Sequence, residues 1–321
     1  MEYSRINTDC ALLDIDGVLI DVKKSYNKAI KKTVDFILQY ITRNPKLKNI
    51  VTDDIILRFR QTGGFNNDVD TCYAIILGVT ASPKKDISYV RRFLLKLAKN
   101  MDETGIASVE EKISASSPSH LDIRNVKEVL FYPAPVGTSF LATVFDEIFY
   151  GPELFKKRHY TYPKYCFDKP LIDNDKLIVT QETIRTLWNE FDGNVSVISG
   201  RSKLAAEYSL KPVFNIFNQN ACVFLEDERR DCAKPNPYSI MKSMKIMKAR
   251  TAIYAGDSIE DLIMSKKAHE EEGLRISFIG VYGCSTKPME IIKLFRAGGA
   301  AAIIQNINQL PNALNKVLAQ M

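Results

Sequence analysis

The stretch CALLDIDGVLID, residues 10–21, places a short apolar run directly before two carboxylates. A continuous apolar run of this kind is typical of a strand that is buried on both faces. Asp14 and Asp16 then stand where the strand ends, and Gly17 allows the chain to turn away. Carboxylates gathered at one point repel each other and are costly to remove from water unless a cation lies among them. The stretch therefore predicts a buried strand that delivers a charged site.

The second half of the chain alternates short apolar runs with amphipathic helical patterns. Such an alternation predicts a parallel sheet covered by helices on both faces. One of these amphipathic stretches is PNPYSIMKSMKIMKAR, residues 235–250, in which Pro235 is placed to open a helix. The strand that ends at Asp14 lies far from this region, so the simplest architecture returns it to the same sheet. The predicted strands of the second half are residues 194–199, 212–217, 251–257, 275–281 and 300–307.

The segment between them, about residues 22–170, has a different pattern and predicts an inserted helical domain. Apolar and aromatic residues recur three or four apart between Val22 and Ile41, which is the spacing of one helical stripe. Thr52 is a predicted N-cap, and two later helices are predicted to end at Gly78 and Gly151. The small, polar stretch SASSPS, residues 114–119, predicts a mobile loop.

Length and composition limit the class of protein. A chain of 321 residues predicts two domains, and 45% apolar with 26% charged residues is typical of a globular protein. No run approaches the roughly 18 apolar residues of a membrane span, and no signal peptide is evident, so we expect a cytoplasmic protein without a membrane partner. The six cysteines form no CxxC pair. A net charge of +6 without a long basic block does not favour nucleic-acid binding. The sequence does not predict an oligomeric state.

In an open parallel sheet, the loops that leave the carboxyl ends of the strands meet at one crevice. The predicted strands deliver a carboxylate pair, a hydroxyl, an ammonium group and a second carboxylate pair to that edge. Magnesium prefers hard oxygen ligands and is commonly held by one or two carboxylates together with a substrate phosphate. A hydroxyl, a backbone amide and a lysine nearby would hold phosphate oxygens, so the set predicts phosphoryl transfer. Besides Asp14 and Asp16, its members are Ser199, Gly200, Lys234, Asp257 and Asp261.

The motifs that carry these residues resemble those of the haloacid dehalogenase superfamily, in its magnesium-dependent phosphatase branch. They are DIDGVLID (14–21), VISGR (197–201), KPNPY (234–238) and GDSIEDL (256–262), in that order along the chain. A helical insertion directly after the first motif is similar to the subgroup of phosphoglycolate phosphatases and β-phosphoglucomutases. The resemblance implies a Rossmann-like, doubly wound α/β core with an inserted all-α cap domain. The domain boundaries are then 1–21 for the first strand of the core, 22–170 for the cap and 171–321 for the rest of the core.

The resemblance also implies a role for each motif residue. Asp14 is the nucleophile that forms an aspartyl-phosphate, and Asp16 protonates the leaving oxygen and later activates water. Ser199, Gly200 and Lys234 bind the transferring phosphoryl group. Mg²⁺ is held by the Asp14 carboxylate, the Asp16 backbone carbonyl and Asp257, and Asp261 supports the metal or Lys234. The implied activity is hydrolysis of a phosphate monoester of a small metabolite.

Three alternative functions differ from phosphate-monoester hydrolysis in the residues or conditions they require. Haloacid dehalogenation needs no magnesium and has no second aspartate in the first motif, so Asp16 argues against it. A sugar phosphomutase uses the same residues and differs in whether water is excluded from the aspartyl-phosphate. A catalytically silent binding or scaffold module is disfavoured by intact Asp14 and Asp16. A phosphate-release assay with magnesium would distinguish such a module from an active phosphatase.

The turn QTGGFNND, residues 61–68, is predicted to carry substrate specificity. Its flanks read as two helices, and its glycines permit a tight helix-turn-helix. Asn66, Asn67 and Asp68 could then bind hydroxyls or amines of the substrate, while Arg58 or Arg60 could bind a second anionic group. The competing interpretation is that residues 66–68 only cap the following helix.

Overall fold

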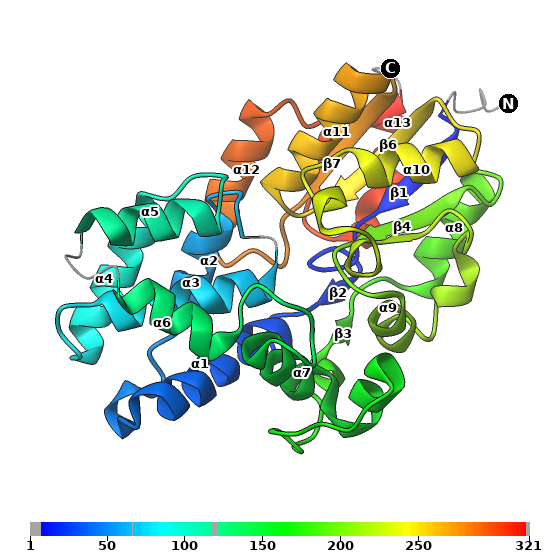
Figure 1. The fold of residues 1–321 in the computed structure, drawn as a ribbon. Helices are drawn as coiled ribbons and strands as arrows, with labels where there is room; N and C mark the ends of the chain where they lie inside the picture. The colour runs from blue at the N-terminus through cyan, green and yellow to red at the C-terminus, as the bar shows by residue number, and fades with distance from the viewer. Residues whose placement is uncertain (1–7, 66, 117–120, 319–321) are drawn as a thin grey trace, which may run out of the picture. The chain divides into compact units, whose positions relative to one another are not determined.

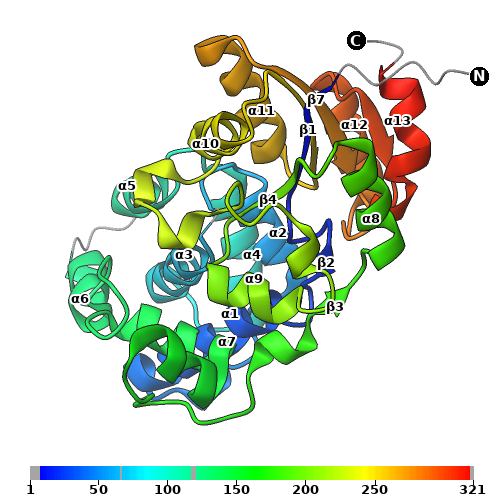
Figure 2. The same ribbon diagram turned by 90° about the vertical axis from the view of Figure 1, so that its right-hand side faces the viewer.

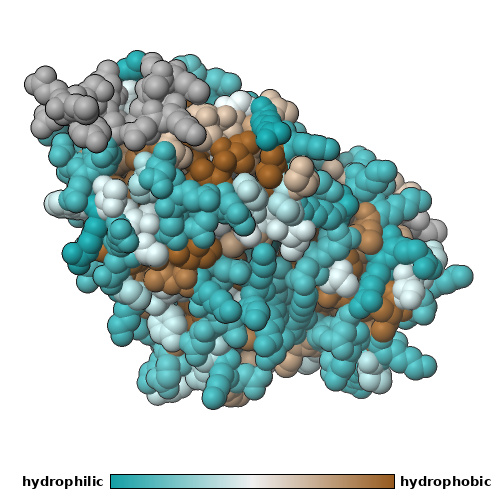
Figure 3. Space-filling model, turned by 180° about the vertical axis from the view of Figure 1, so that it is seen from behind, coloured by the Kyte–Doolittle hydropathy of each residue, from teal (hydrophilic) through white to brown (hydrophobic). Residues whose placement is uncertain are grey.

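The computed structural model describes residues 8–65, 67–116 and 121–318 (Figure 1). The chain divides into two compact units, with the boundaries after Val22 and after Asn174. The first unit contains the N-terminal strand and everything from Asp175 onward, and the second contains the residues between. The sequence placed these boundaries after residues 21 and 170. Of the helices in the described part of the chain, none is long and apolar enough to cross a membrane. Hydrophilic residues cover most of the face drawn in Figure 3, and apolar residues appear there in separate patches.

The first unit is built on a parallel sheet with six strands in the described residues. The strand order is β5-β4-β1-β6-β7-β8, so the N-terminal β1 lies in the middle, between β4 and β6 (Figure 1). Leu13, at the end of β1, is level with Val197 of β4 and Ala255 of β6. This register brings the residues that follow β1 close to those that follow its two neighbours. The strands are β1 (Cys10–Leu13), β4 (Val195–Ser199), β5 (Val223–Phe224), β6 (Thr251–Gly256), β7 (Arg275–Val281) and β8 (Ala302–Ile304).

Helices cover both faces of this sheet, as the sequence predicted for a doubly wound α/β fold. Ala11 and Leu13 of β1 point into one apolar cluster, and Cys10 and Leu12 point into the other, as the period of two in a strand requires. Helices α8 (Gln181–Glu190), α9 (Lys203–Ser209) and α13 (Leu310–Leu318) contribute to the first cluster. Helices α10 (Tyr238–Ile246), α11 (Ile259–Glu272) and α12 (Pro288–Ala297) contribute to the second. Figure 2 shows α10 and α11 on one side of β1, with α8 and α13 on the other.

A short antiparallel ribbon lies where the chain leaves this unit and returns to it. Strand β2 (Ile20–Asp21) pairs with β3 (Lys176–Leu177), with Ile20 opposite Leu177 and Asp21 opposite Lys176. The backbone N–H groups of Ile178 and Val179 also donate to the Leu19 carbonyl, at 2.8 and 3.2 Å. The chain therefore leaves the sheet unit next to one strand of this hydrogen-bonded ribbon and returns next to the other.

The strand prediction for residues 212–217 is wrong. This run forms a 3₁₀ helix, Phe214–Ile216, because the chain keeps turning after α9, with the N–H groups of Val213 and Phe214 both donating to the Leu210 carbonyl. Val213, Phe214 and Phe217 are buried in the core, and Ile216 packs against it partly buried, although the run is not a strand. The edge position belongs instead to β5, a two-residue strand that the sequence did not predict. In the last predicted run only Ala302–Ile304 is a strand, because Asn306 caps a 3₁₀ turn that leads into α13.

Pro235 does not open a helix, contrary to the sequence prediction. Helix α10 begins at Tyr238, and Pro237 occupies its N-cap position. The Asn236 side chain accepts the Tyr238 N–H at 2.9 Å and so satisfies a donor at the start of the helix. Lys234 and Pro235 therefore lie in the loop before the helix.

The second unit is helical, and its most buried element is α3. Every residue from Asp70 to Val79 is buried, so this helix is enclosed by its neighbours. The unit contains, in the described residues, helices α1 (Tyr26–Thr42), α2 (Asp53–Arg60), α3 (Asp68–Ala81), α4 (Ile87–Lys99), α5 (Ile106–Ser116), α6 (Leu121–Leu130) and α7 (Phe140–His159).

The predicted helix boundaries of this unit have different outcomes. Thr52 caps α2 as predicted, because its side chain accepts the Ile55 N–H. Helix α3 does not end at Gly78 but continues to Ala81. A Cβ on Gly78 would lie 2.6 Å from Leu94 of α4, so the glycine permits close helix packing. At Gly151 the backbone leaves the helical conformation, with φ +64°, but a second helical segment continues to His159. Of the predicted loop 114–119, residues 114–116 belong to α5, and the rest lies outside the described residues.

Candidate active site

The loop after β1 presents Asp14 and Asp16 at the carboxyl end of the sheet. The Asp14 N–H donates to the Ala255 carbonyl at 2.9 Å, which fixes the start of the loop against β6. Asp14 is buried, and Asp16 is partly exposed. Gly17 has φ +76°, a conformation that glycine adopts without strain, and its N–H closes the turn onto the Ile20 carbonyl at 2.8 Å.

Gly17 also makes room for Asp257, the residue directly after β6. A Cβ on Gly17 would lie 1.9 Å from Asp257 Oδ2, which is far inside van der Waals contact. The Asp257 carboxylate therefore packs against the bare Cα of the loop that carries Asp14 and Asp16. The glycine is needed twice, for the turn and for the approach of this second acidic residue.

Lys234 lies between two aspartates. Its Nζ is 2.9 Å from Asp14 Oδ1 and 2.7 Å from Asp261 Oδ1, and its side chain is 10% exposed. Although burial alone would lower it, the charges of Asp14 and Asp261 hold the pKa of Lys234 well above its ordinary value. The site therefore keeps a buried ammonium group in contact with the predicted nucleophile.

Asp261 is fully engaged by its surroundings. Oδ1 accepts from Lys234 Nζ and from the Tyr254 hydroxyl at 2.8 Å, and Oδ2 accepts from the Ser258 N–H at 3.1 Å and the Ser258 hydroxyl at 2.6 Å. The same serine side chain accepts the Asp261 N–H, which completes a capping box at the start of α11. Burial would raise the pKa of Asp261, but Lys234 and these hydrogen bonds hold it below its ordinary value.

The acidic groups of the site fit a small cation. Oxygens of Asp14, Asp257 and Asp261 all lie within 4.8 Å of one another. Because Asp261 already accepts four hydrogen bonds, Asp14 and Asp257 are the better direct ligands and Asp261 a supporting group. Burial raises the pKa of Asp14 to about 7 even against the neighbouring ammonium of Lys234. Burial, followed by the charges of Asp14 and Asp261, raises the pKa of Asp257 well above its ordinary value. A cation with a preference for oxygen ligands would favour the ionised form of both.

Ser199 is the last residue of β4, the strand next to β1, and Gly200 follows it. Ser199 is fully buried, and its Oγ accepts the Arg201 N–H at 3.2 Å. Gly200 is exposed, and a Cβ built on it would meet no atom within 4 Å. All seven predicted residues of the core motifs thus belong to the sheet unit. Six lie at the carboxyl ends of β1, β4 and β6 or in the loop that carries Lys234, and Asp261 lies in the first turn of α11.

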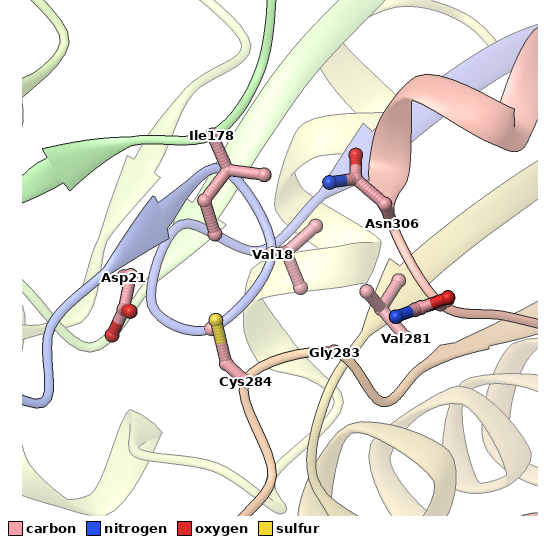
Figure 4. A pocket seen from close by; sticks show the side chains of 9 residues that line it. Val18, Asp21, Ile178, Val281, Gly283, Cys284 and Asn306 are labelled. Atoms are coloured by element: carbon pink, nitrogen blue, oxygen red, sulfur yellow. The ribbon is translucent and has the colours of Figure 1, made fainter.

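A pocket of about 450 Å³ adjoins the loop after β1, on the side of β7 and β8 (Figure 4). Val18, Ile178 and Val281 give it apolar walls, and Asp21 and Asn306 add polar groups. The predicted catalytic side chains are not among the described residues that line it, so the charged centre lies outside this pocket.

Comparison with solved structures identifies the fold. A structural-genomics target matches with a TM-score of 0.63 at 15% sequence identity over 98% of this chain and 100% of its own. Phosphatase Tt82 from Thermococcus thioreducens matches with a TM-score of 0.59 at 18% identity over 95% of this chain and 98% of its own. A protein from Bacteroides fragilis, assigned as a haloacid dehalogenase-like hydrolase, matches with a TM-score of 0.50 at 17% identity over 95% and 100% of the two chains.

The chain has the haloacid dehalogenase-like fold. This confirms the predicted fold class, and it agrees at the level of the fold with the superfamily that the four motifs resemble. No protein-family model and no curated protein matches the sequence.

Two residues of the candidate site were not predicted from the sequence. Arg201, the last residue of VISGR, contacts Asp16 through its Nε, and Tyr254 contacts Asp261 from within β6. The available signals were an arginine next to a predicted phosphate-binding turn and a phenol in an otherwise apolar strand. The capping box was also readable, as Ser258 three residues before Asp261.

The predicted specificity residues of the helical unit have structural partners within it. Arg60 donates to Asp68 Oδ1 at 2.7 Å and to Asn27 Oδ1 at 3.2 Å. Asn67 is the N-cap of α3, and its Oδ1 accepts the Val69 N–H at 2.8 Å. The capping interpretation therefore describes what Asn67 does in this structure, and a role in specificity stays a prediction.

Arg58 and Asn66 are the other two predicted specificity residues. Arg58 forms an ion pair with Asp54 one turn earlier in α2, with 3.8 Å between Nε and Oδ1. Exposed pairs of this type contribute little to stability. Asn66 lies outside the described residues.

Proposed function

We propose that the protein is a phosphatase that hydrolyses a phosphate monoester of a small metabolite through an aspartyl-phosphate on Asp14. The observation that carries this proposal is the environment of Asp14, whose carboxylate lies against the Lys234 ammonium and close to Asp257. A nucleophilic carboxylate, a fixed cation and a second carboxylate suited to a metal ion are what phosphoryl transfer requires.

In the first step, an Asp14 oxygen forms a bond to phosphorus while the bond from phosphorus to the leaving oxygen breaks. Asp16 donates a proton to that oxygen, and the alcohol leaves. Lys234, the Ser199 hydroxyl and the Gly200 amide hold the phosphoryl oxygens during the transfer. In the second step, a water molecule attacks phosphorus, Asp16 accepts its proton, and the Asp14 carboxylate is regenerated with release of phosphate.

We propose Mg²⁺ as the cofactor, held by the Asp14 and Asp257 carboxylates and the Asp16 backbone carbonyl. Its positive charge would keep both carboxylates ionised beside a phosphate dianion. Asp261 supports the site by orienting Lys234. The helical unit, residues 23–174, is proposed to act as the cap, with Arg60 and Asn67 as candidates for substrate specificity.

The proposal is tested by phosphate release from a panel of phosphate monoesters, with and without Mg²⁺. We expect release that depends on Mg²⁺ and is abolished by a chelator. In Asp14→Asn the amide has a similar size but is a poor nucleophile, so turnover should vanish while the circular dichroism spectrum is unchanged. Substantial activity of purified Asp14→Asn protein would overturn the assignment.

A further inference from the structure

Arg201 is a fully buried arginine with two carboxylate partners. Its side chain is 0% exposed; Nε lies 2.5 Å from Asp16 Oδ1, and a guanidinium NH₂ group, Nη1, lies 2.7 Å from Asp175 Oδ2. Nη1 also donates to the Ser209 hydroxyl at 3.0 Å, and that hydroxyl donates to Asp175 Oδ2 at 2.6 Å. A buried charge is retained only when it is paired and hydrogen-bonded, so the network accounts for the position of Arg201.

The partners of Arg201 come from three separate chain segments of the sheet unit. Asp16 lies in the loop before β2, and Asp175 immediately precedes β3, the partner strand of β2. Ser209 is the last residue of α9. The planar guanidinium therefore joins the loop of the predicted catalytic residues to the base of the ribbon.

Asp16 needs such a partner if it transfers protons. Its side chain is 33% exposed, whereas that of Asp175 is 4% exposed, so Asp16 is the more solvent-accessible of the two carboxylates that contact Arg201. General acid–base groups act only when they are within hydrogen-bond reach of the reacting oxygen, and misplacement by about 1 Å can cost about 10²-fold in rate. A rigid fork is better suited to fixing a carboxylate than a flexible ammonium group.

We propose that Arg201 is a positioning residue that holds the Asp16 carboxylate where it serves the leaving oxygen and then the attacking water. The proposal rests on the proposed phosphatase function and adds to it a role for the arginine of the VISGR motif. Asp175 and Ser209 keep the guanidinium in place from the side away from the site. A purely structural arginine would support folding and leave the proton-transfer steps unchanged.

The two roles predict different kinetics for Arg201→Lys, which keeps the positive charge that Asp175 needs but loses the fork. Two substrates of similar shape separate them: phenyl phosphate, whose leaving group needs a proton, and p-nitrophenyl phosphate, whose leaving group departs as the anion. We expect kcat/KM for phenyl phosphate to fall by about 10–10²-fold and that for p-nitrophenyl phosphate by less than about threefold. Because water activation also needs Asp16, acid-quenched protein should carry more aspartyl-phosphate than the wild type.

Arg185→Lys, the same substitution at an exposed position of α8, is the control and should match the wild type. If Arg201→Lys does not fold, Asp175→Asn carries the test, since it weakens the hold on the guanidinium without changing size; the same pattern is expected with smaller losses. Equal losses on both substrates without accumulated phosphoenzyme, or no loss, would overturn the positioning role. A wild type that releases no phosphate with Mg²⁺ would instead overturn the proposed function, and this role with it.

Discussion

Lys234 Nζ lies 2.9 Å from Asp14 Oδ1 and holds the predicted nucleophile in contact with a buried positive charge. The same nitrogen lies 2.7 Å from Asp261, whose other hydrogen bonds fix it to Tyr254 and Ser258. The position of the ammonium group is therefore set from behind, before any phosphate binds. Preorganised charge of this kind costs no reorganisation at the moment of reaction.

We expect Lys234→Met to destabilise the fold as well as abolish turnover. Removing one partner of a buried ion pair leaves an uncompensated charge and typically costs about 3–5 kcal/mol. The free energy of unfolding from urea titration measures the loss. The double variant Lys234→Met/Asp261→Asn should recover part of it, because the remaining buried charge is removed as well. A loss below about 1 kcal/mol in the single variant would contradict the arrangement described here.

Asp16→Ala is expected to slow turnover by about 10²–10⁴-fold, the usual contribution of general acid–base catalysis. The effect should be largest for a substrate with a poor leaving group, since that oxygen must be protonated as it departs. Steady-state kinetics with such a substrate measure it. Near-normal rates would require another role for Asp16.

The pKa of Asp14 predicts how stability depends on pH and Mg²⁺. Its folded-state pKa of about 7 exceeds the ordinary 3.8, so between these values the folded state binds more protons than the unfolded state. This group's contribution to stability is thus full below pH 3.8 and is lost as pH rises through about 7. Mg²⁺ favours the ionised form, so thermal melts should show a larger Mg²⁺-induced rise in Tm at pH 8 than at pH 5.

Asp14→Asn is the control for that experiment, because it removes the titrating group and a proposed metal ligand while conserving size. Its Mg²⁺-induced rise in Tm should be small at both pH values. An equal rise at pH 5 and pH 8 in the wild type would show that the ion binds elsewhere.

The central part of the fold was predictable because it depends on local signals. Residues 275–281 form β7 with the predicted bounds, since a buried parallel strand is a continuous apolar run. Asp14, Ser199 and Asp257 could be placed together because each lies at the carboxyl end of such a run. By contrast, residues 212–217 are equally apolar but form a buried 3₁₀ turn, and periodicity alone does not separate the two.

Long-range partners could not be predicted in the same way. Arg201 contacts Asp16 across 185 positions of sequence and Asp175 across 26, and no local pattern encodes either contact. Gly78 has the sequence signature of a helix end, but packing against Leu94 decides its role. In each case the tertiary contact, and not the local preference, determines the outcome.

Gly17→Ala is expected to reduce Mg²⁺ affinity and turnover while the fold persists. The new Cβ would lie 1.9 Å from Asp257 Oδ2, so the Asp257 carboxylate must move away from Asp14. Gly273→Ala is a matched control, because Gly273 also has positive φ, +64°, but its Cβ would meet nothing within 4 Å. Both variants carry the cost of about 1 kcal/mol for a strained backbone. Only Gly17→Ala should need a higher Mg²⁺ concentration for half-maximal activity; equal requirements would argue against Asp257 as a ligand.

Asn67 and Arg60 of the helical unit are predicted to contribute to substrate specificity. Asn67→Ala removes the N-cap of α3 and should cost about 1 kcal/mol of stability in any case. Arg60→Ala removes the contacts to Asp68 and Asn27. If these residues also recognise substrate, each variant should lower kcat/KM for the best metabolite of the panel by far more than for p-nitrophenyl phosphate.

Thr52→Ala separates that role from capping, because Thr52 is the N-cap of α2 in the same unit and is not a predicted specificity residue. Its loss should cost a similar free energy of unfolding and leave the ratio of the two kcat/KM values unchanged. A ratio that shifts at least tenfold in Asn67→Ala or Arg60→Ala, and not in Thr52→Ala, supports recognition by the turn. If all three variants lose stability and keep the wild-type ratio, Asn67 and Arg60 serve only the architecture of the helical unit, since a cap and an ion pair then account for everything they do.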